Sequence, residues 1–311
     1  MNLDVTYDYF ATNHQCCQDN NGQPDCRPVE GWRCWYDNDA SDHVRINTRY
    51  GPNGCGASAS SSLGIRIGSG KDKHLDSIAH EYTHFLVDLG GTLQATALHE
   101  AYSDVFGQFT EMWYWGGTDW KEGSACGNPQ TCDCLLNPTC PCTRNLADPP
   151  PFGEPDTLNN LDPNNGHADA MIPGKAAFLQ TWNGCEVHMG ISTCGFMNFW
   201  PDGRQKAERI WFDTQEYRLS TTADFTEFRE QMLATTEDLY GISNEWSLTN
   251  LALNAVGIWS SDVEGCQTFP DGEVSVVKFQ VNNETRHYIF YQKGGENTLA
   301  FRYSNHGSDL S

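Results

Sequence analysis

The segment His80-Glu81-Tyr82-Thr83-His84 constrains this chain more than any other feature. Residues four apart lie on one face of a helix, so His80 and His84 can direct two imidazoles at one metal ion. Glu81 then lies on the adjoining arc. The helical period places apolar residues around the segment: Leu75, Ile78, Ala79, Phe85 and Leu86. The pattern predicts a partly buried helix that holds a catalytic zinc, with a carboxylate ready to accept a proton from water.

A second segment can supply the remaining ligand. Glu100 and Asp104, again four residues apart, lie in L-H-E-A-Y-S-D. Glu100 is the predicted third zinc ligand, and Asp104 is placed to hydrogen-bond the far nitrogen of a ligating histidine. The alternative is a helix whose polar side chains are solvated or satisfied in a core. The apolar flanks and the second segment favour the metal.

The two segments, H-E-Y-T-H and H-E-A-Y-S-D-V-F-G, resemble the thermolysin family of neutral metalloproteases. The similarity extends from about Val5 to Ile258. It implies a zincin-like α+β fold, in which a mixed β/α N-terminal part and a mainly helical C-terminal part enclose the active-site cleft. It also implies one catalytic zinc, Glu81 as the general base, an upstream secretion signal and an inhibitory propeptide.

A further match implies a catalytic histidine outside the zinc site. The segment N-N-G-H, followed after seven residues by K-A-A-F-L, resembles a family motif that ends in the catalytic histidine. His167 falls on that histidine. Asp162 falls on the acid that orients it in the family.

Two more matches imply substrate contacts. The segment R-N-L-A-D-P resembles the family's R-S-x-S-D-P, so Arg144 is expected to hold a substrate carbonyl. A structural salt bridge, for example to Asp148, is the alternative role for Arg144. Ala57 and Ser58 fall near the family's substrate-binding edge strand, where an extended peptide adds to a sheet.

The sequence also departs from the family pattern. His84 and Glu100 are sixteen positions apart, four fewer than in well-known members. The tyrosine that assists the transition state in the family has no counterpart. Tyr102 is a candidate substitute, with core packing as its other possible role. His99 stands where the family has asparagine, and we expect it to support a neighbouring ligand.

Three carboxylates match the family's calcium cluster: Asp76, Glu111 and Asp119. With backbone carbonyls and water, three carboxylates are enough for one ion, which we expect to be present. Lys121 and Ser124 replace two other family ligands, so a double site is not expected. The alternative is that Lys121 neutralises the carboxylates itself.

Charge limits the classes of partner. The 311 residues include 41 acidic and 19 basic side chains, which gives a formal net charge of −22. Such a field argues against nucleic acid and anionic membranes as partners. It can favour basic peptides, although a solvated acidic surface is common on extracellular proteins. The sequence has no apolar run of the roughly 20 residues that a membrane span needs.

Thirteen cysteines indicate an oxidising compartment and disulfides. Cys185 and Cys194 are expected to close a small loop. The cluster between Cys126 and Cys142 could hold a structural zinc, but it contains no histidine and suits a loop stapled by disulfides. Because the count is odd, at least one thiol is free or pairs outside this chain, and Cys266 is the candidate.

Pattern changes divide the chain into four regions. Residues 1–115 contain strands at 43–49 and 63–68 and helices at 3–13, 73–89 and 97–115. Residues 116–165 are rich in cysteine and proline and are expected to be irregular. Residues 166–258 predict helices at 167–182, 202–219, 223–239 and 243–256. Residues 259–311 alternate like strands at 274–281, 287–292 and 298–303, as in a small β extension.

These patterns predict a secreted, monomeric zinc endopeptidase that acts on peptide or protein substrates. The alternative is a catalytically weak or inactive zinc-binding module for adhesion or interaction on the same fold. The cysteine-rich loops and the missing tyrosine allow that alternative. Retention of Glu81, His167 and Asp162 argues against it, because a structural zinc needs none of them.

Overall fold

The structure, a computed structural model, describes most of the chain between residues 74 and 259 and shorter segments outside that range. The described residues are 2–13, 46–48, 57–60, 64–67, 74–87, 89–124, 142–162, 164–259, 267–268, 274–281, 284–292 and 299–304. The predictions for the cysteines from Cys126 to Cys140 and for Cys266 lie outside them. The chain divides into two compact units, Met1–Ile258 and Trp259–Ser311.

A small sheet precedes the first histidine helix. Its strands are β1 (Ile46–Thr48), β2 (Ala57–Ser60) and β3 (Gly64–Ile67), in the order β1-β3-β2. β1 runs parallel to β3, and β2 runs antiparallel to it. Alternate residues of β3 are buried, and Ile65 and Ile67 pack with Ile78 of the next helix. This packing ties the sheet to the helix that carries both histidines.

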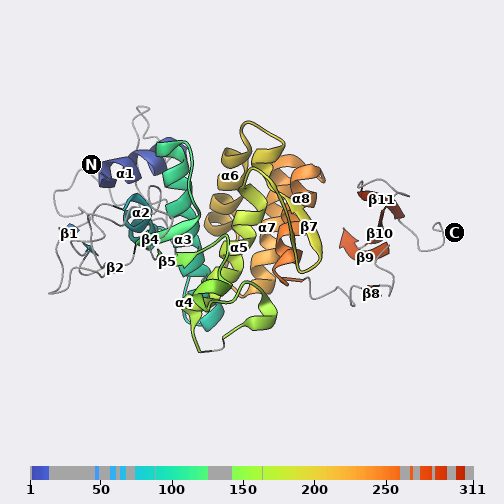
Figure 1. Cartoon of the computed structure of the whole chain (residues 1–311), viewed down its shortest axis with the longest axis horizontal. Helices are drawn as coiled ribbons and strands as arrows, with labels where there is room; N and C mark the ends of the chain where they lie inside the picture. Colours follow the sequence, from blue (N-terminus) through green and yellow to red (C-terminus); the bar gives the residue numbers. More distant parts are fainter. Residues whose placement is uncertain are drawn as a thin grey trace. The chain divides into compact units, whose positions relative to one another are not determined.

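Three helices of the first unit form its N-terminal half: α1 (Asn2–Asn13), α2 (Leu75–Thr83) and α3 (Leu93–Trp115). α3 stands between α1 and α2 on one side and the C-terminal helices on the other (Figure 1). It begins four residues earlier than predicted, because Thr92 caps it by accepting a hydrogen bond from the backbone N–H of Ala95. A Cβ atom at Gly107 would lie 2.9 Å from the carbonyl oxygen of Asp76, so glycine allows α3 to approach α2 closely.

The C-terminal half of the unit is helical, as predicted, with one exception. Its helices are α4 (Gly166–Asp169), α5 (Met171–Thr181), α6 (Gly203–Tyr217), α7 (Phe225–Tyr240) and α8 (Asn244–Ala255). The predicted helix 167–182 is thus two helices that meet at Ala170. Aromatic side chains join this half to α3: Tyr102 lies 5.0 Å from Trp211, and Trp211 lies 5.3 Å from Phe228, between ring centroids.

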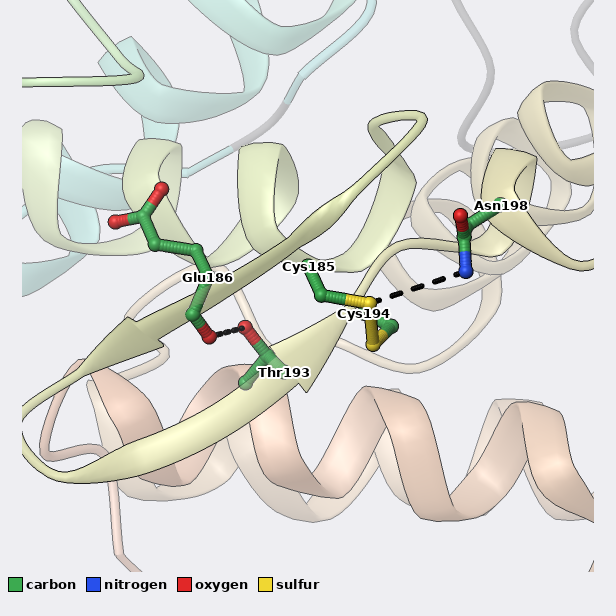
Figure 2. Close-up of a disulfide and its surroundings, with 5 residues drawn as sticks. All are labelled: Cys185, Glu186, Thr193, Cys194 and Asn198. Atoms are coloured by element: carbon green, nitrogen blue, oxygen red, sulfur yellow. Dashed lines mark hydrogen bonds between the residues drawn. A yellow bond between two sulfur atoms is a disulfide. The ribbon is translucent and has the colours of Figure 1, made fainter. Parts of the chain in front are cut away.

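The exception is a hairpin of β6 (Cys185–His188) and β7 (Ile191–Cys194), which packs on α8 and α5. Cys185 and Cys194 lie opposite each other and form the expected disulfide (Figure 2). The two-residue turn has positive φ at both positions, 48° at Met189 and 77° at Gly190. Methionine rarely adopts that conformation, so the residue pattern does not predict the hairpin.

The connecting region is less irregular than expected. β4 (Lys121–Ser124) pairs antiparallel with β5 (Cys142–Asn145), and Glu122 lies opposite Arg144. Single 3₁₀ turns follow, η1 (Pro150–Phe152) and η2 (Leu158–Asn160), and a third, η3 (Phe196–Asn198), precedes α6. The β4–β5 pair therefore brings the two ends of a long connection together beside α2 and α3.

The second unit is an antiparallel sheet. Its strands are β8 (Gln267–Thr268), β9 (Val274–Val281), β10 (Glu284–Gln292) and β11 (Leu299–Ser304), in the order β11-β10-β9-β8. The three longer strands lie where alternation predicted them, and β8 is additional. Within the described residues, no helix in either unit is long and apolar enough to span a membrane.

Candidate metal centre

His80, His84 and Glu100 converge at the contact between α2 and α3. In the described part of the chain they are the one group of three or more metal-binding side chains whose ligand atoms lie within 4.8 Å of one another. We call them the metal-ligand cluster. The Nε2 atoms of the two histidines are 3.0 Å apart, and the Glu100 carboxylate lies 3.5 Å from His80 Nε2 and 3.8 Å from His84 Nε2.

The donor set and its spacing fit a zinc ion. Two nitrogens that each lie 2.0–2.1 Å from a tetrahedral zinc are about 3.3 Å apart, close to the spacing of the histidine nitrogens. If each ring donates its Nδ1–H, both Nε2 atoms present lone pairs to each other, and a cation between them would remove their repulsion. A set of two histidines and one glutamate, with a further position for water, is typical of catalytic zinc.

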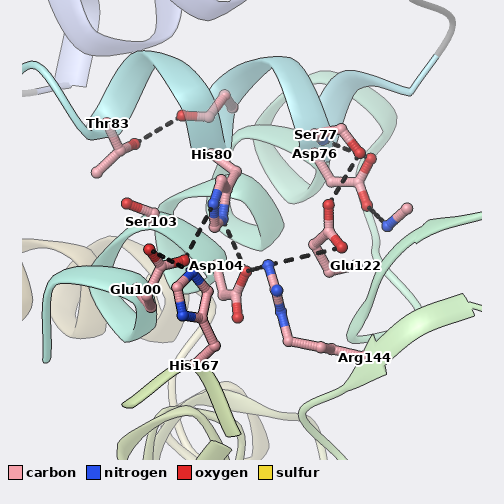
Figure 3. Close-up of polar contacts among 12 residues, drawn as sticks. Asp76, Ser77, His80, Thr83, Glu100, Ser103, Asp104, Glu122, Arg144 and His167 are labelled. Atoms are coloured by element: carbon pink, nitrogen blue, oxygen red, sulfur yellow. Dashed lines mark hydrogen bonds and ion pairs between the residues drawn. The ribbon is translucent and has the colours of Figure 1, made fainter. Parts of the chain in front are cut away.

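Asp104 fixes the first histidine. Its Oδ1 lies 2.8 Å from His80 Nδ1, so the imidazole donates that N–H and directs Nε2 into the cluster (Figure 3). Asp104 is fully buried on α3, one turn after Glu100. Burial lowers the pKa of His80, but the hydrogen bond and charge of Asp104 outweigh burial and raise the pKa above its usual 6.5.

Two groups of α3 hold the second histidine. His84 Nδ1 lies 3.1 Å from Ser103 Oγ and 3.1 Å from His99 Nε2. Ser103 donates its own proton to the carbonyl oxygen of His99, so its oxygen accepts from His84. This pairing leaves His84 Nε2 as a lone pair for a metal. Burial, together with the neighbouring His80 and His99, lowers the pKa of His84 strongly, which favours the neutral ligand form.

Glu81 and His167 border the cluster from different helices. Glu81 follows His80 on α2 and is only 5% exposed. His167 belongs to α4, its side chain is 65% exposed, and its Nε2 lies 3.3 Å from Glu100 Oε1. Gly166 lets α4 pack tightly on α3, since a Cβ atom there would lie 3.1 Å from the carbonyl oxygen of Leu93. A buried carboxylate and an accessible imidazole therefore both border the cluster.

The expected pairing of Asp162 with His167 is not present in the described residues. The Asp162 carboxylate instead accepts a hydrogen bond from the backbone N–H of Asn164, two residues on, as in an Asx turn. Its own backbone N–H is bound by the buried carboxylate of Asp169. This local turn competes for Asp162, and the role predicted from the resemblance gains no support from the geometry.

Arg144 forms an ion pair, but not with Asp148. Its Nη2 lies 2.6 Å from Asp104 Oδ1 and 3.6 Å from Glu122 Oε2. Burial lowers the pKa of Arg144, but these two carboxylates more than offset burial and raise it. The guanidinium therefore stays charged. Asp104 links it to His80, because the same carboxylate oxygen contacts both side chains (Figure 3).

Glu122 is a site residue that motif analysis missed. Ser77 lies on α2 one turn before His80, and its hydroxyl donates to Glu122 Oε1 at 3.0 Å. Glu122 is 2% exposed. The only sequence signal was an acidic residue after the predicted calcium ligands. Its importance comes from the β4–β5 pairing, a contact between distant segments that the sequence pattern does not reveal.

Two other candidates have clear positions. Ala57 and Ser58 lie on β2, which is the last strand on one side of the described N-terminal sheet. Tyr102 is fully buried among aromatic rings, and its hydroxyl has no hydrogen-bond partner in the described residues. Tyr102 therefore belongs to the core and cannot reach a substrate.

The predicted calcium ligands do not form a group in the described part of the chain. Asp76 accepts a hydrogen bond from the backbone N–H of Gly123 at 2.5 Å, and Asp119 accepts one from the backbone N–H of Lys121 at 3.0 Å. Glu111 lies on α3 and accepts a side-chain hydrogen bond. Among the described residues, Lys121 forms no ion pair with Asp76, Glu111 or Asp119. A calcium ion here thus stays a prediction that the geometry does not support.

Comparison with known proteins identifies the family. Residues 88–258, more than half of the chain, match the family described as "Thermolysin metallopeptidase, alpha-helical domain". Bacillolysin from Bacillus caldolyticus and thermolysin from Alicyclobacillus acidocaldarius subsp. acidocaldarius are each 31% identical over 195 residues, which cover 60% of this chain and 33% of the relative. Neutral protease B from Bacillus subtilis (strain 168) is 29% identical over 194 residues, or 59% of this chain and 32% of the relative.

A solved structure supports the same fold. The precursor of protealysin, a metalloproteinase from Serratia proteamaculans, matches with a TM-score of 0.58 at 20% identity, over 83% of this chain and 76% of that chain. The predicted zincin-like α+β class is thereby confirmed. The chain spans about a third of the length of the curated relatives it matches. On the family match, the chain belongs to the thermolysin metallopeptidase family.

Proposed function

We propose that this chain is the catalytic part of a secreted zinc endopeptidase. One observation carries the proposal: two imidazole nitrogens and a carboxylate converge within 4.8 Å at the junction of α2 and α3. A zinc ion held there would polarise the substrate carbonyl and lower the pKa of water from 15.7 towards about 7. The other residues of the chain then supply proton transfer, charge and orientation.

Glu81 is the proposed general base. Its carboxylate accepts a proton from the attacking water and later transfers it to the leaving amine. Burial of Glu81 keeps bulk water away and strengthens its interaction with charges nearby. His167 approaches from α4 and donates to the developing oxyanion, a contribution whose loss typically costs about 10²–10³ in rate.

Arg144 and β2 are proposed to hold the substrate. Asp104 and Glu122 fix the guanidinium of Arg144, whose side chain is 16% exposed, and this fixed charge is proposed to orient a substrate carbonyl. β2, with Ala57 and Ser58, ends the described sheet and is proposed to pair with an extended peptide.

Secretion and synthesis as a precursor form part of the proposal. The disulfide between Cys185 and Cys194 requires an oxidising compartment. The structural relative is a precursor of a metalloproteinase, which favours an inhibitory propeptide here as well. We expect a monomer that acts on peptides or proteins and binds no nucleic acid.

The test is cleavage of a fluorescence-quenched peptide library with and without 1,10-phenanthroline, on protein of measured zinc content. We expect cleavage that the chelator abolishes and that added zinc restores. Full zinc occupancy without cleavage would reject the peptidase and favour the zinc-binding interaction module.

Glu81→Gln separates chemistry from metal binding. We expect it to keep zinc and lose cleavage by several orders of magnitude, because the amide cannot accept the proton. Glu230→Gln, a change of the same type at an exposed site on α7, is the matched control and should stay active. An active Glu81→Gln protein would contradict the assigned base.

A further inference from the structure

The position of His167 depends mainly on its backbone. Its side chain is 65% exposed, and its Nε2 lies 3.3 Å from Glu100 Oε1; Figure 3 shows the two side chains next to each other. Few side chains pack around an imidazole that is mostly in solvent, so its place at the metal-ligand cluster follows from the place of α4. α4 has only four residues, and so short a helix is not stable by itself. Contacts with the rest of the unit must therefore hold it.

The two ends of α4 are held differently. At its end, α5 follows directly after Ala170, and both Ala170 and the residues of α5 are buried. At its start, the Asn165 side chain accepts a hydrogen bond from the backbone N–H of Ala168 at 3.2 Å. Gly166 packs on α3, where a Cβ atom would lie 3.1 Å from the carbonyl oxygen of Leu93. These contacts position the helix itself but leave the loop before it to be fixed by another group.

Asp169, the last residue of α4, connects the helix to that loop. Its Oδ1 accepts the backbone N–H of Asp162 at 2.8 Å, seven positions earlier in the chain. Asp169 is only 2% exposed, so this hydrogen bond is shielded from competing water. The Asp162 carboxylate, in contrast, accepts a hydrogen bond from Asn164 within its own turn. The buried carboxylate of Asp169 thus joins the two ends of the segment that carries His167.

We propose that Asp169 is a positioning residue for His167. The inference rests on the proposed function, in which His167 donates to the developing oxyanion. A displacement of about 1 Å in a catalytic group can cost about 10²-fold in rate, so a fixed α4 matters for the chemical step. Because Asp169 acts through the backbone, its loss should lower kcat and leave KM and zinc content nearly unchanged.

The test is a double-mutant cycle with His167→Ala, on zinc-loaded protein and one quenched peptide. Asp169→Ala should lower kcat by about 10- to 100-fold and change KM by less than about threefold. In the His167→Ala background the same substitution should change kcat by less than about twofold, because no imidazole remains to be positioned. An equal loss of kcat in both backgrounds would show that Asp169 supports the fold only, and would overturn the inference.

Two further variants separate positioning from a general loss of stability. Asp169→Asn keeps an oxygen that can accept the Asp162 N–H, so it should retain kcat within about threefold. Asp224→Ala is the matched control, because Asp224 also accepts a backbone N–H, that of Glu227 at 2.8 Å, but at the start of α7. It should lower the thermal midpoint and leave kcat unchanged. If Asp169→Asn is as slow as Asp169→Ala, or Asp224→Ala loses as much kcat, the inference is wrong.

The outcomes also distinguish this inference from the proposed function. Full activity of His167→Ala would overturn the role of His167, and this inference with it, but would leave the zinc peptidase intact. If the parent cleaves no peptide, amide hydrogen exchange on the zinc-loaded protein decides whether Asp169 holds α4. The amides of Asp162, Ala168 and Ala170 should then exchange at least about tenfold faster in Asp169→Ala than in the parent, because local opening becomes easier. Unchanged exchange at these amides would overturn the inference.

Discussion

At the residue scale, Asp104 connects the two halves of the candidate centre. One carboxylate oxygen contacts both the Nδ1 of His80 and the guanidinium of Arg144. The aspartate therefore orients a metal ligand and a proposed substrate contact together. Few single substitutions in this chain should affect metal binding so directly without removing a ligand.

We predict that Asp104→Asn lowers zinc affinity by about 10- to 100-fold, because the amide no longer carries the charge that supports His80. Competition with a calibrated chelator measures this change. Asp238→Asn is the matched control, since that side chain is 68% exposed. Unchanged affinity in Asp104→Asn would show that the His80 contact does not tune the metal.

Tyr102 offers a second prediction at this scale. Its hydroxyl is buried without a partner in the described residues, so Tyr102→Phe should leave cleavage unchanged and raise stability by up to about 1 kcal/mol. Tyr9 is equally buried but its hydroxyl hydrogen-bonds Glu208, so Tyr9→Phe should lower stability by about 1 kcal/mol. Urea unfolding compares the two. Loss of activity in Tyr102→Phe would restore that residue as a catalytic candidate.

At the element scale, local stabilisation differs between the hairpin and the N-terminal helix. The β6–β7 hairpin is closed by a covalent link across its first and last residues. α1 depends on buried side chains, among them Tyr9, which reaches Glu208 on α6. The hairpin should respond to reduction, and the contact between α1 and α6 should respond to pH.

We predict that replacing both Cys185 and Cys194 with serine lowers the free energy of unfolding by about 2–3 kcal/mol. The reason is that a link across nine positions restricts the unfolded chain. Thermal unfolding of the double variant and the parent measures the effect. Metal content should be unchanged, since neither residue lies at the metal-ligand cluster. A loss of zinc in this variant would mean that the hairpin supports the centre.

The pH prediction concerns Glu208, which is 2% exposed and contacts Arg204. Burial raises its pKa in the folded chain to about 7, from an ordinary 4.5. The folded state then binds more protons than the unfolded state between these values, so this contribution to stability is full below about pH 4.5 and is lost as pH rises through 7.

Glu208→Gln removes that titration. Relative to the variant, the parent should lose about 2–3 kcal/mol of stability between pH 5 and pH 8, measured by urea unfolding. Glu230→Gln serves as a control because its side chain is exposed. A difference between parent and Glu208→Gln that is independent of pH would contradict the assignment.

At the scale of the whole molecule, the sequence pattern predicts the features that depend on the spacing of nearby residues. His80, His84, Glu100 and Asp104 follow the helical period, and the structure brings them together as that period requires. The start of α3 was placed too late, although the capping signal of Thr92 was available. The helical C-terminal half followed from the same periodicity.

Structural features that form through contacts between distant segments could not be predicted from the sequence pattern. The Ser77–Glu122 bond joins residues 45 positions apart and exists because β4 pairs with β5. The role of Asp162 implied by the resemblance stays a prediction, since the contact that its carboxylate makes in the described residues is with its own turn. Long-range pairing and competition between nearby hydrogen bonds thus decide the features that distinguish this centre.

The central claim is that His80, His84 and Glu100 share one zinc ion. Anomalous diffraction above and below the zinc absorption edge, on crystals of the zinc-loaded protein, tests it most directly. We predict one strong peak within about 2.0–2.2 Å of both histidine Nε2 atoms and of the Glu100 carboxylate. No peak at that position in zinc-saturated crystals, or a peak bound only by other residues, would contradict the account.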